Sequence, residues 1–456
     1  MTFLVAAVAL QTSYSVIQNV SIITPGETKV QKAKDVAFDG KQILWIKNHS
    51  NIAAAPDVRL IDGSGKFLIP GLWDMHTHLS DGKSLGLFTA NGVTGIRVMF
   101  GATYQLSLRK DVQNGKILGP TMVLGSPIVD GPKPIWPGSI AVSNAEQARV
   151  AVRKIKQDGY DFVKVYSLLS REAYFAIADE CKKEKIPFAG HVPHSVGLLE
   201  AQKAGQISAE HVMGNLVECS THADEFRQKF DQVVGEGMAK TSEMSRAAAA
   251  EIIDSFSAEK EKALVKGLKG GALWQCPTLV VLRNVAYMND GRFGSDPRNK
   301  YVNPFVLNGW DPAKDFRLKN RTAVDWERAQ KSYLATFQFT KKLVEGGANV
   351  LAGTDCLNPF VYPGFSLHDE LDLLVKVGMS PTQALASATV NPARFLGLSK
   401  THGRIEIGKV ADLVLLTANP LEDIRNTTKI DMVVNSGKVF DRSELDKVLA
   451  ERSFVK

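Results

Sequence analysis

The segment Leu72-Trp73-Asp74-Met75-His76-Thr77-His78 decides the fold, because an apolar stretch ends there in a His-x-His pair. Residues two apart on a β-strand face the same side, so both imidazoles can bind one metal ion. Four more strand-like segments carry a metal-ligand residue type at or near their ends, namely Lys164 in 162–166, His191 in 188–191, His211 in 208–211 and Asp355 in 350–355. The pattern predicts a divalent-metal site, and we expect two ions in it.

The histidines have to be weighed against chance. The chain contains nine, and any single one is more often a core or surface residue than a ligand. Four of the nine lie at strand-like ends, which is hard to obtain by accident. Taken by itself, Lys164 is more simply interpreted as a lysine whose stem is buried and whose ammonium reaches solvent. A fully buried lysine has a lowered pKa, however, and a neutral amine can bind CO2 to become a carbamate that bridges two cations.

Composition limits the class of protein. At 456 residues the chain is longer than one usual compact domain, although an α/β barrel alone can reach about 250 residues. Its 44% apolar and 23% charged residues are ordinary globular values. The net charge of +7 comes from scattered Lys and Arg, so nucleic-acid binding is not indicated. The four cysteines lack CxxC spacing, which excludes a zinc finger, and no apolar run is long enough for a transmembrane helix.

The order of elements predicts the fold. Strand-like segments come first, at 15–23, at 36–38 and 42–46 around an Asp39-Gly40 turn, and at 58–61 and 66–69. From Pro70 strands alternate with helices, which implies a parallel sheet. Eight strands can be counted through Asp355, the seventh at 277–279, and Ser143-Asn144-Ala145-Glu146 looks like a helix-starting capping box. We therefore expect a (β/α)8 TIM barrel with a small β-sandwich domain formed from both chain ends.

The expected boundaries follow from these patterns. They are an apolar N-terminal arm or signal remnant at 1–13, a first β-sandwich segment at 14–69, the barrel at 70–403, a second β-sandwich segment at 404–441 and a C-terminal helix at 442–456. The arm leaves an exported and a cytoplasmic location equally open. Long polar insertions at 219–269 and 283–325 are candidate lids, because loops after barrel strands lie over the active-site face. The alternative is plain surface decoration.

These motifs carry a family resemblance over nearly the whole chain. Pro70 to His78 resembles the opening motif of the amidohydrolase superfamily, and further segments match in order: 162–166, 189–193, 210–211, 352–355, 388–397 and 403–414. Within the superfamily the chain is most similar to the imidazolonepropionase-like and prolidase-like metallohydrolases. True imidazolonepropionases keep one metal and lack the fourth-strand lysine, so Lys164 argues against that reaction. Deaminases have a Glu near the fifth-strand histidine. This chain has Val192-Pro193-His194 there, which argues against deamination.

The resemblance implies a ligand assignment. His76, His78 and Asp355 would hold the more buried Zn2+, His191 and His211 the more exposed one, and carbamylated Lys164 would bridge the two. A hydroxide shared by both ions would attack the substrate, since metal coordination lowers the pKa of water. Asp355 would accept its proton and pass it to the leaving group. Tyr166 would donate a hydrogen bond to the developing oxyanion, or else is a rim aromatic in water.

The expected function is a binuclear metal-dependent hydrolase that cleaves amide bonds, with dipeptides or N-acyl amino acids as the leading substrates. The alternative keeps the metal centre but shifts the substrate to a lactone, ester, carbamate or urea. A non-catalytic scaffold is disfavoured because all six ligand positions are retained. For a substrate carboxylate the basic candidates are Lys133 and Arg283, and His194 is a further candidate contact. The expected partner is a small-molecule substrate, and a homo-oligomer is compatible with the sequence.

Overall fold

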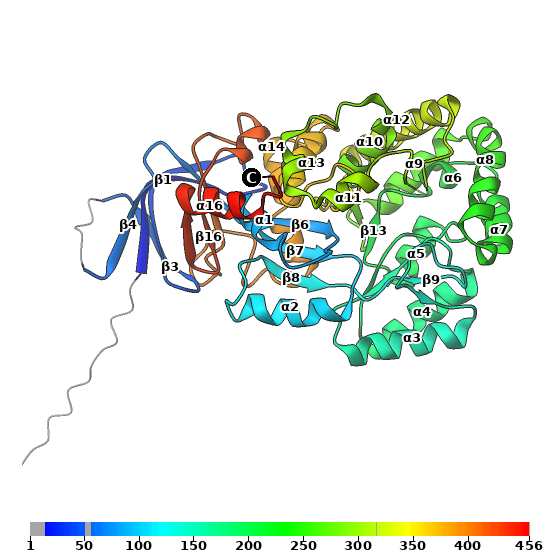
Figure 1. Cartoon of the computed structure of the whole chain (residues 1–456), viewed down its shortest axis with the longest axis horizontal. Helices are drawn as coiled ribbons and strands as arrows, with labels where there is room; N and C mark the ends of the chain where they lie inside the picture. Colours follow the sequence, from blue (N-terminus) through cyan, green and yellow to red (C-terminus); the bar gives the residue numbers. More distant parts are fainter. Residues whose placement is uncertain (1–13, 51–55, 316, 456) are drawn as a thin grey trace, which may run out of the picture.

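The computed structural model describes residues 14–50, 56–315 and 317–455. An α/β body of strands surrounded by helices carries a β-sheet at one end (Figure 1). The arm expected at 1–13 lies outside the described residues. Within the described residues, no helix has both the length and the apolar character needed to cross a membrane.

The body is a closed ring of eight parallel strands. Seven of them are β6 (Leu72–Thr77), β7 (Val93–Val98), β8 (Thr121–Leu124), β11 (Val163–Val165), β12 (Phe188–Gly190), β13 (Ser208–Glu210) and β14 (Trp274–Cys276). The segment 350–356 is the eighth. Parallel bridges close the ring between Gly125 and Phe162, Gln275 and Val350, and Thr77 and Cys356. The expected barrel is therefore confirmed.

One strand position was wrong. The seventh strand was expected at 277–279 but ends at Cys276. Thr278 adopts a left-handed backbone with φ +48° and precedes α10 (Leu279–Ala286). The apolar residues that looked like a strand belong to the buried face of this helix, and a short apolar run does not distinguish the two.

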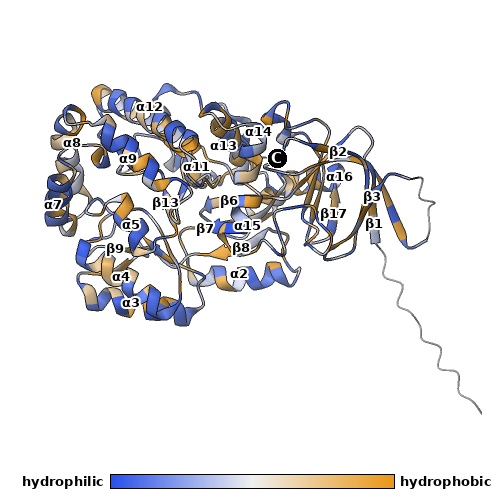
Figure 2. Cartoon of the chain, turned by 180° about the vertical axis from the view of Figure 1, so that it is seen from behind, coloured by the Kyte–Doolittle hydropathy of each residue, from blue (hydrophilic) through white to orange (hydrophobic). Residues whose placement is uncertain are grey.

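Helices cover the ring on its outside. They are α1 (Leu85–Ala90), α2 (Thr103–Gln113), α3 (Ala145–Asp158), α4 (Arg171–Glu184), α5 (Leu198–Ala204), α6 (Asn215–Glu218), α12 (Ala323–Glu345), α13 (Phe365–Lys376), α14 (Pro381–Ser387) and α15 (Val390–Phe395). In α3 the residues Ala148, Val152 and Ile155 are buried at helical spacing. Its N-cap is Asn144, which accepts from the Gln147 amide, one residue later than the expected Ser143. Figure 2 shows the mixed hydrophilic and hydrophobic residues of such outer helices.

Both chain ends build the additional sheet. Its strands are β1 (Tyr14–Ile23), β2 (Val30–Phe38), β3 (Ile43–Asn48), β4 (Val58–Asp62), β5 (Phe67–Pro70), β15 (Leu413–Leu416), β16 (Ile430–Asn435) and β17 (Lys438–Asp441), in the order β17-β16-β15-β5-β1-β2-β3 with β4 beside β1. β5 pairs with β15, so the two chain ends form one continuous, sandwich-like sheet, as expected. Its apolar core includes Phe38, Leu68 and Leu415, and α16 (Arg442–Arg452) follows it.

The two insertions are mainly helical. The first forms α7 (Ala223–Val233), η1 (Val234–Glu236), α8 (Met238–Asp254) and α9 (Ala258–Leu268), and the second forms η2 (Met288–Asp290), η3 (Pro297–Tyr301) and α11 (Pro304–Gly309). Short β9 (Val129–Asp130), β10 (Ile140–Ala141) and η4 (Ile424–Thr428) complete the elements. Trp310, Trp326 and Tyr362 form a local core that anchors the second insertion. All four cysteines are free and buried.

Candidate metal centre

The six ligand-type side chains converge at the carboxyl end of the barrel strands. His76 lies in β6 and His78 just after it, Lys164 lies in β11, His191 and His211 directly follow β12 and β13, and Asp355 lies near the end of the eighth strand. Parallel strands end at one edge of the ring, so residues far apart in sequence meet there. This is the face where barrel enzymes place their active sites.

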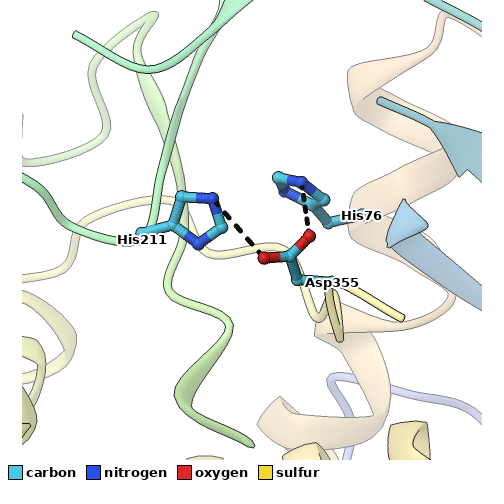
Figure 3. Close-up of side chains that lie close together, drawn as sticks. All are labelled: His76, His211 and Asp355. Carbon is cyan, nitrogen blue, oxygen red and sulfur yellow. Dashed lines mark ion pairs between the residues drawn. The ribbon is translucent and has the colours of Figure 1, made fainter. Parts of the chain in front are cut away.

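Asp355 is the centre of the group. Its Oδ1 lies 2.7 Å from His78 Nε2 and 3.3 Å from His76 Nε2, and its Oδ2 lies 3.9 Å from His211 Nε2. Figure 3 shows His76 and His211 on either side of this carboxylate, both directed toward it. The ring centroid of His211 is 4.8 Å from that of His76 and 4.8 Å from that of His191. The carboxylate thus stands between the two ligand sets that the sequence suggested.

Three of the histidines are oriented by a second residue. His76 Nδ1 lies 2.8 Å from Glu210 Oε2, His191 Nδ1 lies 2.7 Å from Ser167 Oγ, and His211 Nδ1 lies 2.6 Å from Thr278 Oγ1. Each bond leaves Nε2 available. Metal-binding histidines almost always bind an outer partner through their other nitrogen. Sequence reasoning did not assign these partners, although Glu210 at an apolar strand end was a usable signal.

The donor set fits a metal. Ligand atoms of His76, His211 and Asp355 lie within 4.8 Å of one another, and a mixed imidazole and carboxylate set suits Zn2+ among other ions. His78 Nδ1 is buried and has no hydrogen-bond partner among the described residues. A buried polar atom without a partner is costly, but the nitrogen of His78 that faces Asp355 is the other one, Nε2.

Burial and charge set the protonation states of the group. Burial lowers the pKa of His211 to about 3 and holds the pKa of His191 well below its ordinary value. Burial opposes ionisation of Asp355, but His76 and His78 hold the pKa of its carboxyl well below the usual range. Burial also lowers the pKa of Lys164 from 10.5 to about 8. Neutral imidazoles and an ionised carboxylate are the forms that bind metals.

A buried ion pair contacts the candidate ligand His76. Arg97 on β7 and Glu210 on β13 are 1% and 0% exposed, and Arg97 Nη2 lies 2.9 Å from Glu210 Oε1. Arg97 also donates to the Met75 carbonyl and to Ser208 Oγ. Burial alone would raise the pKa of Glu210, yet Arg97 and His76 hold it well below its ordinary value. The ionised Glu210 thereby fixes the tautomer of His76.

The backbone at the site is unusual where the ligands must turn inward. Asp355 and His211 have φ values of +63° and +64°, a left-handed region that is costly for residues other than glycine. Gly353 has no room for a side chain, because a Cβ there would lie 2.5 Å from Cys276 Sγ and 2.8 Å from His76 Cβ. This close approach lets the eighth strand bring Asp355 against β6.

A cavity of about 530 Å3 opens above these residues. Its floor includes His78, Lys164, His191, His211 and Asp355, and its walls include residues of α10, of α12 and of the second insertion. Tyr166 lines it too, stacked on His191 with ring centroids 4.0 Å apart. Trp136 Nε1 donates to Tyr166 Oη at 2.8 Å, which leaves the phenol proton of Tyr166 available. Burial raises the pKa of Tyr166 well above its ordinary value, so it remains a donor.

Three expected substrate contacts do not line this cavity, namely Lys133, Arg283 and His194. Lys133 is exposed and lies against Gly237. Arg283 is on α10, but its Nε donates to Asn284 Oδ1, and neighbouring Val281, Leu282 and Val285 form the cavity wall instead.

His194 turns away from the metal centre. Its ring stacks on Phe230 with centroids 5.1 Å apart, and it lines a separate small pocket with Glu218 and Arg227. Burial lowers its pKa to about 4, as expected of a neutral packed imidazole.

Of the two candidate lids, the second supplies cavity residues, Arg317 and Arg321, whereas the first supplies none among the described residues.

The comparisons with known proteins agree with this arrangement. Residues 335–440 match the model of the amidohydrolase family. An imidazolonepropionase of Geobacillus sp. (strain WCH70) is 37% identical over 107 residues, or 23% of this chain. That match spans only a quarter, 25%, of the length of the curated relative.

Solved structures extend the amidohydrolase likeness to the whole fold. A bottromycin amidohydrolase superposes with a TM-score of 0.76 at 23% identity, covering 97% of this chain and 90% of the other. A Xaa-Pro dipeptidase with bound methionine superposes with a TM-score of 0.67 at 19% identity, covering 94% and 100%. At such identities the likeness establishes the fold alone, which this chain shares with those two proteins.

Proposed function

We propose that this amidohydrolase-fold protein is a binuclear metal-dependent hydrolase that cleaves the amide bonds of dipeptides or N-acyl amino acids. The observation that carries the proposal is the convergence of five ligand-type side chains with a sixth, Asp355, at the carboxyl end of the barrel. Three outer partners orient the histidines for that purpose. Structural ion pairs alone do not account for four imidazoles gathered with one carboxylate beneath an open cavity.

The ligand roles follow the sequence proposal, except that Asp355 would contact both metal sites and not one. His76, His78 and Asp355 would hold one ion, His191 and His211 the other, and Lys164 would contribute once its neutral amine has taken up CO2 and released a proton. Asp355 is near enough to His211 for its carboxylate to contact both sites. When bound, the metal pair would supply a Lewis acid and a water of lowered pKa.

Two side chains would handle the reacting atoms. The ionised carboxylate of Asp355 would accept the proton of the attacking water and then deliver it to the leaving amine. The phenol of Tyr166 would donate a hydrogen bond to the carbonyl oxygen as negative charge develops there. Trp136 would position Tyr166, because its indole occupies an acceptor site of the phenol oxygen and directs the remaining proton elsewhere.

The substrate class is supported by the cavity. Its volume of about 530 Å3 is in the usual range for small-molecule sites. Val281, Leu282 and Val285 give it an apolar wall, and Arg317 and Arg321 give it cationic groups. Those features suit an amide that bears an apolar side chain and a carboxylate. One structural neighbour is a Xaa-Pro dipeptidase, which is compatible with this class.

A substrate screen tests the proposal. The full chain, purified with zinc and bicarbonate, is assayed against a library of dipeptides and N-acyl amino acids, with lactones, esters, carbamates and ureas beside them. We expect hydrolysis in the first group that a chelator abolishes and that added zinc restores. Activity confined to the lactones or carbamates would replace the amide proposal, and no activity in any group by metal-loaded protein would favour a non-catalytic role.

A further inference from the structure

The cavity carries two arginines from the second insertion, and their environments differ. Arg317 is held by Asp315, whose Oδ1 lies 3.0 Å from Arg317 Nε and whose Oδ2 lies 2.6 Å from Arg317 Nη2. Its Nη1 lies 3.4 Å from Asn358 Oδ1, and its Cζ lies 5.2 Å from the Trp136 ring centre. The charge of Arg317 is therefore already balanced, and this residue connects the insertion to the rim of the metal centre.

Arg321 has no direct ion pair of this kind among the described residues, although Asp325 and Asp315 are neighbouring charges. Its Nη1 is buried and has no hydrogen-bond partner among the described residues, while its Cζ rests 4.8 Å from the ring centre of Trp326. The nearby carboxylate, Asp325, is engaged elsewhere, since it accepts from the amide and hydroxyl of Thr322 and lies 3.6 Å from Arg328. Burial lowers the pKa of Arg321, as expected of a cation whose lost hydration is not replaced.

A guanidinium in a cavity wall with one unsatisfied nitrogen, Nη1, favours an anionic ligand. Leaving a buried donor without an acceptor costs stability, and a charge-assisted bond to a carboxylate is about twice as strong as a neutral one. The planar guanidinium can also bind both carboxylate oxygens. The stacking of Arg321 on Trp326 holds this group in one orientation, which reduces the entropy lost when a ligand binds.

We propose that Arg321 is the residue that selects substrates by their free carboxylate, with the apolar wall of Val281, Leu282 and Val285 holding the adjoining side chain. The inference rests on the proposed function and names the group that its substrates must carry. It moves the recognition of the carboxylate from Lys133 and Arg283 to Arg321, near the far end of the second insertion. Arg317 positions the segment rather than binding the anion.

A binding experiment tests this proposal without requiring turnover. N-methanesulfonyl-L-leucine and the neutral alcohol N-methanesulfonyl-L-leucinol have the same apolar side chain, and neither contains a carboxylic amide bond that the protein could cleave. Dissociation constants for both are measured by titration calorimetry on the full zinc-loaded chain. The variants are Arg321→Met, Arg321→Lys and the matched control Arg328→Met, which removes an exposed arginine of α12 that does not line the cavity.

We expect the wild type and Arg328→Met to bind the acid at least about tenfold more tightly than the alcohol. Arg321→Met should abolish that preference, and Arg321→Lys should keep some of it because the charge remains. Thermal unfolding of each variant shows whether it is folded. A preference that survives in Arg321→Met, or wild-type protein that binds neither probe or both equally, overturns the proposal. Preferential binding without any amide hydrolysis would instead refute the proposed function and leave this inference standing.

Discussion

Arg97 and Glu210 form a buried ion pair directly beneath His76, with Arg97 Nη2 2.9 Å from Glu210 Oε1 and Glu210 Oε2 2.8 Å from His76 Nδ1. The pair joins β7, β13 and β6, three strands that are not all neighbours in the ring. Neither residue faces the cavity. The pair therefore orients a candidate ligand and couples the centre to barrel stability.

The first prediction concerns this pair. Arg97→Met should destabilise the protein by about 3–5 kcal/mol, because it leaves a buried carboxylate without its partner. Arg109→Met breaks the more exposed pair with Asp161 and should cost about 1 kcal/mol or less. Urea unfolding of the metal-free proteins measures both. Similar costs for the two variants would show that the buried pair has no special role.

The second prediction concerns metal content. Protein purified with zinc and bicarbonate should contain about two equivalents of zinc by mass spectrometry, as a two-metal site requires. Lys164→Ala should lower this stoichiometry and the turnover, since the bridging group is lost. Lys182→Ala, an exposed lysine on α4, is the control. One equivalent in the wild type, unchanged by bicarbonate, would remove Lys164 from the centre.

The third prediction separates chemistry from assembly. Asp355→Asn preserves the shape of the side chain and an oxygen donor but cannot take up a proton. We expect kcat to fall by about 10²–10⁴-fold, the usual contribution of a general base, with a much smaller change in KM. Metal content measured on the same preparation is the control. A parallel loss of zinc and activity would mean that Asp355 acts chiefly as a ligand.

The fourth prediction concerns Tyr166. Its phenol should stabilise the developing oxyanion, so Tyr166→Phe should reduce kcat by about 10²–10³-fold while KM changes little. Trp136→Phe removes the indole N–H that positions the phenol and should give a smaller loss in kcat. Steady-state kinetics on the best amide substrate from the screen measures both. If Tyr166→Phe raises KM alone, the residue binds substrate without acting in the transition state.

The fifth prediction is a pH dependence of stability. In metal-free, bicarbonate-free protein the pKa of Lys164 is lowered from 10.5 to about 8. Between these values the unfolded chain binds more protons than the folded one, so stability relative to Lys164→Met should rise with pH. The rise is at most about 1.4 kcal/mol per pH unit and fades as the pH falls through about 8. Urea unfolding at several pH values measures it, and parallel curves for the two proteins would contradict the lowered pKa.

The sequence alone determined the barrel and the identity of the candidate ligands. Strands that end in His76, His78, His191, His211 and Asp355 are local patterns, and parallel strands place their carboxyl ends at one edge whatever the loops do. Local patterns gave the wrong prediction where one pattern is compatible with two structures. The apolar run after Cys276 is a helix, and the helix cap moved from Ser143 to Asn144.

Only the tertiary structure decided what surrounds those ligands. Glu210, Ser167 and Thr278 orient histidines that are distant in sequence or on other elements, and no spacing rule connects them. Arg321 reaches the cavity, while Lys133 and Arg283 do not, although all three are basic residues in segments that follow barrel strands. The physical reason is that a strand fixes the direction of its side chains by its own geometry, whereas the direction of a loop side chain depends on the packing of the whole insertion.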